Sequence, residues 1–282
     1  MPASPNTAPG IPRKPANLSI PPRPEVVNLL LAEKDKEQPD LRRVAQAIMA
    51  DVGLAGAMLK AVNSPAFGLR RKATNVATAV DLLGMKQVAT LAMGLVLRHV
   101  EGGGPAMDRF WDTAEKVALT TSYLAGRLRG IGREEAYTYG LFHDCGIPMM
   151  MQRYPDYKTV LLQANQAYDE AFTEVEDKAL GTHHAAMGYF LAKSWYLPDD
   201  LCQAILRHHE TGVYDPGAGA GEGVLTMIGI GHIAGHVHHT YMRTGDDAEW
   251  AKFKPLVCRH FGLDQEDLIN LLEDAQGFLT EL

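Results

Sequence analysis

REEAYTYGLFHDCGIPMM, residues 133–150, is the stretch on which the fold class depends. Its apolar residues recur with the 3.6-residue period of a helix, so the sequence predicts one helix over 133–150. The same period runs through seven further segments of the second half: 107–130, 155–168, 171–193, 198–210, 222–243, 247–261 and 264–280. The period-2 alternation of strands is nearly absent. These segments are joined by short turns, so the expected fold is an all-α bundle with pockets between facing helices.

The first half follows the same pattern after a proline-rich start. Residues 1–18, MPASPNTAPGIPRKPANL, are predicted to be a disordered tail because they cannot bury enough apolar surface. A helix is expected after the proline entry at Ile20, and Asp40 is the expected N-cap of the next one. Further helices are predicted near 54–62, 73–82 and 85–100.

Glycines mark the expected boundaries of the chain. The run at 102–104 predicts a division into an N-terminal helical lobe, 19–104, and a C-terminal lobe, 105–282. Residues 212–223, GVYDPGAGAGEG, are predicted to be a flexible surface loop.

Composition limits the functional classes. Hydrophobic residues make up 46% of the chain, which is ample for a core, and the net charge of −7 argues against a broad nucleic-acid surface. The three cysteines are widely spaced and odd in number, which indicates neither a disulfide framework nor a zinc knuckle. A reducing cytoplasm is therefore the expected compartment. No run of 18 apolar residues occurs, so direct membrane insertion is not expected.

Several short phrases follow one another along the chain: IPPRP at 20–24, the D-x-x-L phrase at 51–54, Val62-Asn63-Ser64, residues 79–84, Phe110-Trp111, LFHDCG at 141–146, His184 with Gly188, Trp195 with Leu197-Pro198, and His208-His209. In this order they resemble the HDOD domain, the HD-related output domain of bacterial signalling proteins. Independent coincidences at each phrase would be needed to produce this order. The resemblance covers residues 20 to about 210 and implies an HD-like bundle in two lobes with a role in signalling.

The resemblance also implies an ancestral metal site. In HD-type phosphohydrolases an upstream His, a His-Asp pair and a distant Asp gather around divalent metal. Here the upstream position is Thr113, and the distant Asp is replaced by His232. The candidate metal ligands are His143, Asp144, His184, His208, His209 and His232. Imidazole ligands favour transition metals over magnesium, so zinc, iron, manganese or nickel are the candidate ions.

An interpretation in which these residues bind no metal competes with the metal site and is preferred. A buried His143–Asp144 pair can serve packing alone, with the carboxylate fixing the imidazole. His232, His236 and His239, with His238 beside them, share one helical face, but a single helix offers too few ligands to close a metal shell. No bound cofactor is therefore expected.

The cyclic-dinucleotide phosphodiesterases called HD-GYP are a poor match. His208-His209-Glu210 matches a phrase of that family, but the G-Y-P that should follow is absent. The family's lysine three residues after the Asp is replaced by Ile147 or Pro148.

The resulting interpretation is a non-catalytic signalling module that acts through protein–protein contacts, with no catalytic residue assigned. Thr113 and the missing Asp and Lys remove water activation and charge neutralisation from the ancestral pocket. A kinase, a receiver or a nucleotide cyclase is the expected partner, meeting the cleft between the lobes and the loop 212–223. Two alternatives stay open: a metal-dependent phosphohydrolase acting on cyclic dinucleotides or nucleotides, and a nucleotide sensor without turnover. No oligomeric state is predicted.

Overall fold

Helices carry the regular structure of this chain, as the 3.6-residue period predicts. The computed structural model describes residues 23–34, 36–100, 105–242 and 245–282, and this part of the chain contains no strand. The all-α prediction is therefore confirmed. The predicted tail, 1–18, and the glycines 102–104 lie outside the described residues, so both remain predictions.

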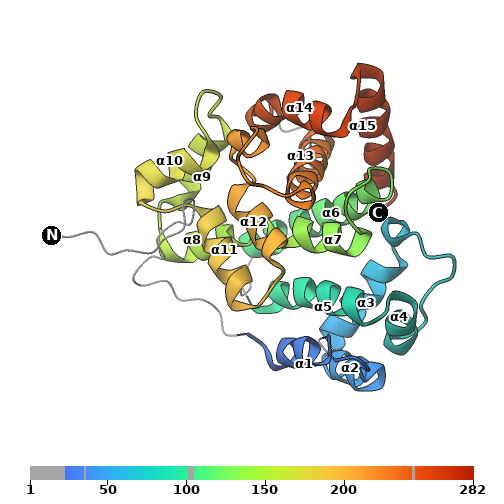
Figure 1. The fold of residues 1–282 in the computed structure, drawn as a ribbon. Coiled ribbons are helices and arrows are strands. Elements are labelled where there is room, and N and C mark those ends of the chain that lie inside the picture. Colours follow the sequence, from blue (N-terminus) through green and yellow to red (C-terminus); the bar gives the residue numbers. More distant parts are fainter. Residues whose placement is uncertain (1–22, 35, 101–104, 243–244) are drawn as a thin grey trace.

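The N-terminal helices form one end of the molecule (Figure 1). They are α1 (Glu25–Lys34), α2 (Leu41–Met49), α3 (Val52–Asn63), the short η1 (Pro65–Phe67), α4 (Val76–Leu83) and α5 (Met85–Val100). Asp40 caps α2 as predicted, because its side chain accepts hydrogen bonds from the amides of Arg42 and Arg43. The buried carboxylate of Glu33 ties α1 to the start of α2: Oε1 accepts from Arg43, and Oε2 accepts from the Asp40 amide.

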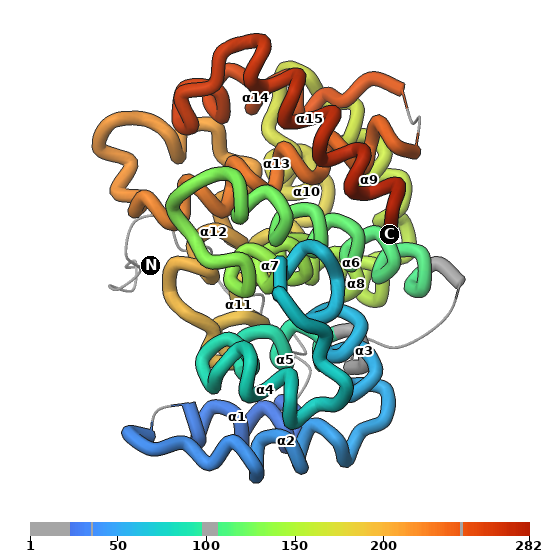
Figure 2. The backbone as a smooth tube through the Cα atoms, turned by 90° about the vertical axis from the view of Figure 1, so that its right-hand side faces the viewer, coloured from blue at the N-terminus to red at the C-terminus, as the bar shows by residue number. Residues whose placement is uncertain are grey.

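The remaining helices build the part of the fold that carries the predicted site. They are α6 (Pro105–Ala125), α7 (Arg133–Phe142), α8 (Gly146–Arg153), α9 (Tyr157–Asn165), α10 (Phe172–Leu180), α11 (His184–Ser194), α12 (Asp199–Arg207), η2 (Thr211–Tyr214), α13 (Glu222–Met242), α14 (Ala248–Phe261) and α15 (Gln265–Thr280). Figures 1 and 2 place α6 and α7 between the N-terminal helices and α13 to α15. The pair packs closely at Gly140, where a Cβ atom would lie 2.5 Å from Oγ1 of Thr121.

The helix predicted over 133–150 is broken in the structure, and the break carries the site. α7 ends at Phe142, residues 143–145 form a turn, and α8 begins at Gly146. Pro148 explains the break, because proline has no amide hydrogen to donate to the carbonyl of residue 144 and its ring clashes with that carbonyl. His143 and Asp144 therefore lie in a turn and not on a continuous helix.

The helix predicted over 171–193 is also two helices, α10 and α11. Gly181 ends α10 with φ of 70°, the left-handed conformation that glycine adopts without steric cost. His183 then caps α11, because its Nδ1 atom accepts a hydrogen bond from the Ala186 amide at 3.2 Å. This turn places His184 at the start of α11, where its side chain faces the turn that carries Asp144.

The buried apolar side chains form one cluster that runs from Val27 to Leu279. Trp111 and Trp195 belong to it with 2% and 0% of their surface exposed, which agrees with their predicted role as core anchors. This cluster contains residues from both sides of residue 104. The predicted division into lobes at that position remains a prediction.

None of the described helices is by itself long and apolar enough to cross a bilayer, although the pair α2 and α3, bent by 115°, meets the length and composition requirement jointly.

Candidate metal centre

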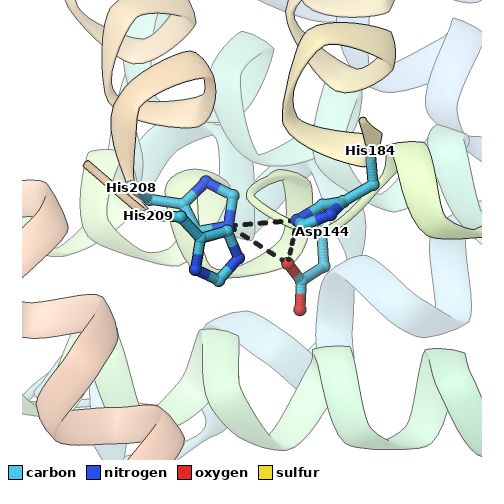
Figure 3. A group of neighbouring side chains, drawn as sticks. All are labelled: Asp144, His184, His208 and His209. Atoms are coloured by element: carbon cyan, nitrogen blue, oxygen red, sulfur yellow. Dashed lines mark hydrogen bonds and ion pairs between the residues drawn. The ribbon is translucent and has the colours of Figure 1, made fainter. Parts of the chain in front are cut away.

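Four of the predicted ligands converge in the structure. Asp144 comes from the turn between α7 and α8, His184 from the first residue of α11, and His208 and His209 from the end of α12 (Figure 3). One potential ligand atom from each side chain lies within 4.8 Å of the others. All three imidazoles are buried, and Asp144 is part-buried.

Within this group a carboxylate oxygen and imidazole nitrogens, all potential hydrogen-bond acceptors, face one another. Oδ1 of Asp144 lies 3.4 Å from Nε2 of His184 and 3.3 Å from Nε2 of His208. The two Nε2 atoms are themselves 3.3 Å apart. Such a cluster needs a cation or a proton among its atoms, because two acceptors cannot hydrogen-bond to each other.

The opposite ring nitrogen of each histidine already has an acceptor. Nδ1 of His184 donates to Oε2 of Glu176 at 2.7 Å, and Nδ1 of His208 donates to the Ile205 carbonyl at 2.7 Å. Nδ1 of His209 donates to Oε1 of Glu249 at 2.6 Å. A hydrogen bond from one ring nitrogen leaves the lone pair of the other free for a metal. The donor set, three Nε2 atoms and one carboxylate oxygen, therefore fits a divalent transition metal.

The electrostatics of the site follow from this crowding. Burial alone would lower the pKa of His184, but the charges and hydrogen bonds of Glu176 and Asp144 outweigh burial and raise this pKa to about 10. Burial would raise the pKa of Asp144, yet its histidine partners hold that pKa well below its ordinary value. Burial lowers the pKa of His208 and, further, that of His209. At neutral pH Asp144, His208 and His209 are thus in their metal-binding protonation states, whereas His184 holds a proton that a bound metal would displace.

Sequence reasoning missed the carboxylates that orient the ligands. Glu176 is fully buried, and its other oxygen accepts a hydrogen bond from the Tyr157 hydroxyl. A signal for it existed, because Glu176 lies four residues after Phe172 and four before Leu180, on the apolar face of α10. Glu249 follows its partner His209 by 40 residues, and no spacing rule connects the two.

Two predicted ligands lie beside the group and not in it. Nδ1 of His143 donates to the Gly140 carbonyl at 2.8 Å, and its Nε2 faces Oδ2 of Asp144 at 3.2 Å. Nε2 of His232 donates to the His208 carbonyl at 2.7 Å, and its ring stacks on Phe253. His232 therefore supports the backbone of a ligand, whereas the sequence had placed it among the ligands.

The other histidines of α13 bind separate acceptors. Nδ1 of His236 pairs with Oδ2 of Asp247 at 3.0 Å, and Nε2 of His239 pairs with the Gly245 carbonyl at 3.0 Å. Within the described part of the chain these rings are not part of the group of four possible metal ligands.

A cavity of about 520 Å³ opens beside Asp144, His208 and His209. Its wall comes from α6, α8, α9, α13 and α14, and includes Thr113 and His232. Neither lysine nor arginine occurs among the described residues that line it. The candidate metal centre is therefore reachable from the cavity. The described residues of the cavity wall include no permanently cationic side chain.

Comparisons with known proteins agree with this architecture. The family model for the HDOD domain matches residues 20–211. A Treponema pallidum protein of uncharacterised function is 27% identical over 190 residues, which cover 64% of this chain and 36% of that protein. The matched segment thus spans about a third of the curated relative's length.

Two solved structures share the fold at low identity. A Shewanella amazonensis protein named for a proposed phosphohydrolase activity is 23% identical, with a TM-score of 0.65 and coverage of 92% of this chain and 93% of that one. A Marinobacter aquaeolei protein named for a proposed role in signal transduction is 20% identical, with a TM-score of 0.61 and coverage of 93% and 58%. The two names point to different activities, and likeness at this level carries the fold alone.

Proposed function

Because this chain belongs to the HDOD domain family, we propose that it is a signalling module that holds one divalent transition-metal ion and acts on a protein partner without turnover. The observation that carries the proposal is the convergence of Asp144, His184, His208 and His209, with their potential ligand atoms within 4.8 Å of one another. These four donors suit one ion.

The positions around this group argue against a second ion. Two-metal hydrolases clamp the reacting oxygens between ions about 3.5–4 Å apart, and each ion needs its own ligands. Thr113 offers only a neutral hydroxyl where the family resemblance places a histidine. The Nε2 atom of His232 is already bonded to the His208 carbonyl. The converging donors therefore form one set of four ligands, and His143 lies beside them with its Nε2 atom facing Asp144.

The cavity wall supports binding over turnover. A bound metal would supply Lewis acidity and lower the pKa of a coordinated water. Phosphoryl and phosphodiester chemistry also needs cationic groups that neutralise the charge developing on the phosphate. The described part of the wall contains no lysine or arginine for that role. The chain's own residues hold and orient the ligands, and no general acid or base is assigned.

Metal binding would affect the rest of the molecule through the helices next to the ligand residues. Asp144 precedes α8, His184 begins α11, and His208 follows α12, so one ion would link three segments. A ligand that binds only the folded arrangement stabilises it by mass action. Metal occupancy would thereby bias the surface offered to a kinase, receiver or nucleotide cyclase, with the loop 212–223 at its edge. The Marinobacter aquaeolei protein's name supports a signalling role.

A metal-dependent phosphohydrolase is the second candidate, and one observation favours it. The cavity reaches Asp144 and His143, whose side chains pair directly at 3.2 Å, so a water in the cavity would have a carboxylate and an imidazole within reach. The name of the Shewanella amazonensis protein points the same way. Cyclic dinucleotides or nucleotides would be the substrates.

Metal analysis combined with a hydrolysis assay separates the two candidates. Tag-free protein should contain one transition-metal ion per chain by mass spectrometry, and Asp144→Ala should lose it. Asp156→Ala, which removes an exposed carboxylate, is the matched control. Manganese- or iron-loaded protein should hydrolyse bis(p-nitrophenyl) phosphate and cyclic dinucleotides no faster than Asp144→Ala. Turnover that depends on Asp144 would establish the second candidate, and protein that binds no ion would overturn both.

The output step needs its own test. Capture of a kinase, receiver or cyclase from the source organism's lysate, weakened by Asp144→Ala but not by Asp156→Ala, would support it. Identical capture by the two variants would exclude control by the metal.

A further inference from the structure

The cavity beside the metal centre has the size of a ligand site. Its volume of about 520 Å³ falls within the range of about 300–1,000 Å³ that small-molecule pockets occupy. Asp144, His208 and His209 are among the residues that line this cavity. A molecule inside it could therefore reach a bound metal with one end while the rest of the molecule contacts the wall.

Part of the cavity wall is apolar. Six aliphatic, thioether and aromatic side chains from α6, α8, α9 and α13 line it: Phe110, Val117, Ile147, Met151, Leu161 and Met242. Side chains of this kind gain free energy by removing apolar ligand surface from water, and they offer no hydrogen bonds to sugar hydroxyls or phosphates. The wall therefore favours a ligand with an apolar body.

The charges of the wall disfavour a polyanion. The described lining residues contain the carboxylates Asp144, Asp247 and Glu249 and no lysine or arginine. Seven histidines also line the cavity, and burial lowers the pKa of four of them: His208, His209, His232 and His238. Lys252 is close, but its Nζ atom pairs with Oε2 of Glu249 and donates to the carbonyls of Ala167 and Glu170. A bound divalent metal would be the main positive charge, and it can match one anionic group. The several charges of a nucleotide or cyclic dinucleotide would lack partners.

We infer that this cavity binds a small molecule with an apolar body and one anionic metal-chelating group, in preference to a nucleotide. This inference rests on the metal-binding function proposed above. Aromatic hydroxamates and aromatic carboxylates are the chemical class. The anionic group would meet the metal beside Asp144, and the ring would contact Phe110, Leu161 and their neighbours.

Paired probes on the cobalt-loaded full chain test the inference. Benzohydroxamate and acetohydroxamate carry the same chelating group, and only the first has an aromatic body. Isothermal titration, with the visible spectrum of cobalt as a second readout, should show benzohydroxamate binding at least tenfold more tightly. A cyclic dinucleotide should bind more weakly than benzohydroxamate. Equal affinity of the two hydroxamates, or tighter binding of the dinucleotide, would overturn the inference while leaving the metal site intact.

Variants of the cavity wall test whether its side chains cause the tighter binding of benzohydroxamate. Phe110→Ala should reduce the advantage of benzohydroxamate at least threefold and leave acetohydroxamate unchanged. Tyr168→Ala, which removes an aromatic ring that is 51% exposed and does not line the cavity, should change neither. If Phe110→Ala fails to fold, Leu161→Ala provides the same test from α9, since Leu161 is only partly buried. If neither wall variant reduces the affinity of benzohydroxamate relative to acetohydroxamate, the aromatic ring binds outside this cavity and the inference is wrong. Protein that does not retain cobalt would overturn the proposed function as well.

Discussion

Oε2 of Glu176 accepts hydrogen bonds from both the ring Nδ1 and the backbone amide of His184, at 2.7 and 3.2 Å. One buried carboxylate therefore fixes the position, orientation and tautomer of this imidazole. Partners of this kind raise the basicity of a metal-ligating histidine and hold its free nitrogen toward the ion.

Glu176→Gln should weaken metal binding without removing a ligand. The substitution keeps the shape of the side chain but removes the charge that holds His184, and such changes cost about 10–100-fold in metal affinity. Competition with a chromophoric chelator measures the effect. Glu174→Gln, which changes an exposed residue of the same helix, is the control. Equal affinities for the two variants would show that Glu176 does not orient the ligand.

His232→Ala should leave one ion bound per chain. Its Nε2 atom donates to the His208 carbonyl and does not face the cluster, so its loss disturbs the backbone of a ligand only. We expect the affinity to fall by less than about tenfold, whereas His208→Ala should cost more than about 100-fold, beyond the usual range for supporting residues. Chelator competition on both variants makes the comparison. Equal losses in the two would mean that His232 is itself a ligand.

Gly146→Ala should destabilise the fold at the site. A Cβ atom there would lie 1.9 Å from the carbonyl oxygen of His184 and 2.9 Å from the Gly188 nitrogen, so α8 and α11 would have to separate. Overpacking typically costs about 1–3 kcal/mol, and here metal affinity should fall with it. Urea unfolding of the metal-free protein gives the stability change.

The matched control is Gly56→Ala in α3, where nothing lies within 4 Å of the new Cβ. That variant should be more stable by about 0.5–1 kcal/mol, because glycine is a poor residue inside a helix. Equal unfolding free energies for the two variants would contradict the close approach of α8 to α11.

Glu33 should give the N-terminal helices an acid-sensitive contact. The hydrogen bond from Lys36, followed by that from the Asp40 amide, lowers the pKa of Glu33 below its ordinary value of 4.5. The folded-state pKa lies below the unfolded value, so the stabilisation is fully present above about pH 4.5 and is lost as the pH falls through the lowered pKa. Urea unfolding of Glu33→Gln should therefore show a deficit at pH 7 that shrinks as the pH falls below 4.5. The exposed Glu37→Gln should show no such change. A deficit independent of pH would assign the role of Glu33 to packing.

Helix periodicity predicted nearly every helix and failed where two helices meet end to end. Residues 133–150 keep an apolar period across Pro148, and residues 171–193 keep one across Gly181, so pattern alone joined α7 to α8 and α10 to α11. The breaking residues were visible in the sequence. Their effect depends on tertiary packing, such as the contact of Gly146 with the His184 backbone, which a single sequence does not contain.

The sequence indicated where the site lies but not which candidate residues come together as one group of ligands. The order of phrases in the chain pointed to Asp144, His184, His208 and His209, whereas the substitution at Thr113 favoured a site without functional metal. The structure separates these observations, because Thr113 lies in the cavity wall while the four side chains form a group of their own. Glu176 and Glu249 were missed because each meets its histidine only through the fold.

Anomalous X-ray diffraction at the absorption edge of the metal identified in the purified protein would show where that metal binds and how many ions are present. We expect a single peak within bonding distance of Asp144, His184, His208 and His209, and no such peak in crystals of Asp144→Ala. Two peaks about 3.5–4 Å apart, the spacing of two-metal hydrolases, would contradict it. So would crystals of metal-loaded protein with no peak among these four side chains.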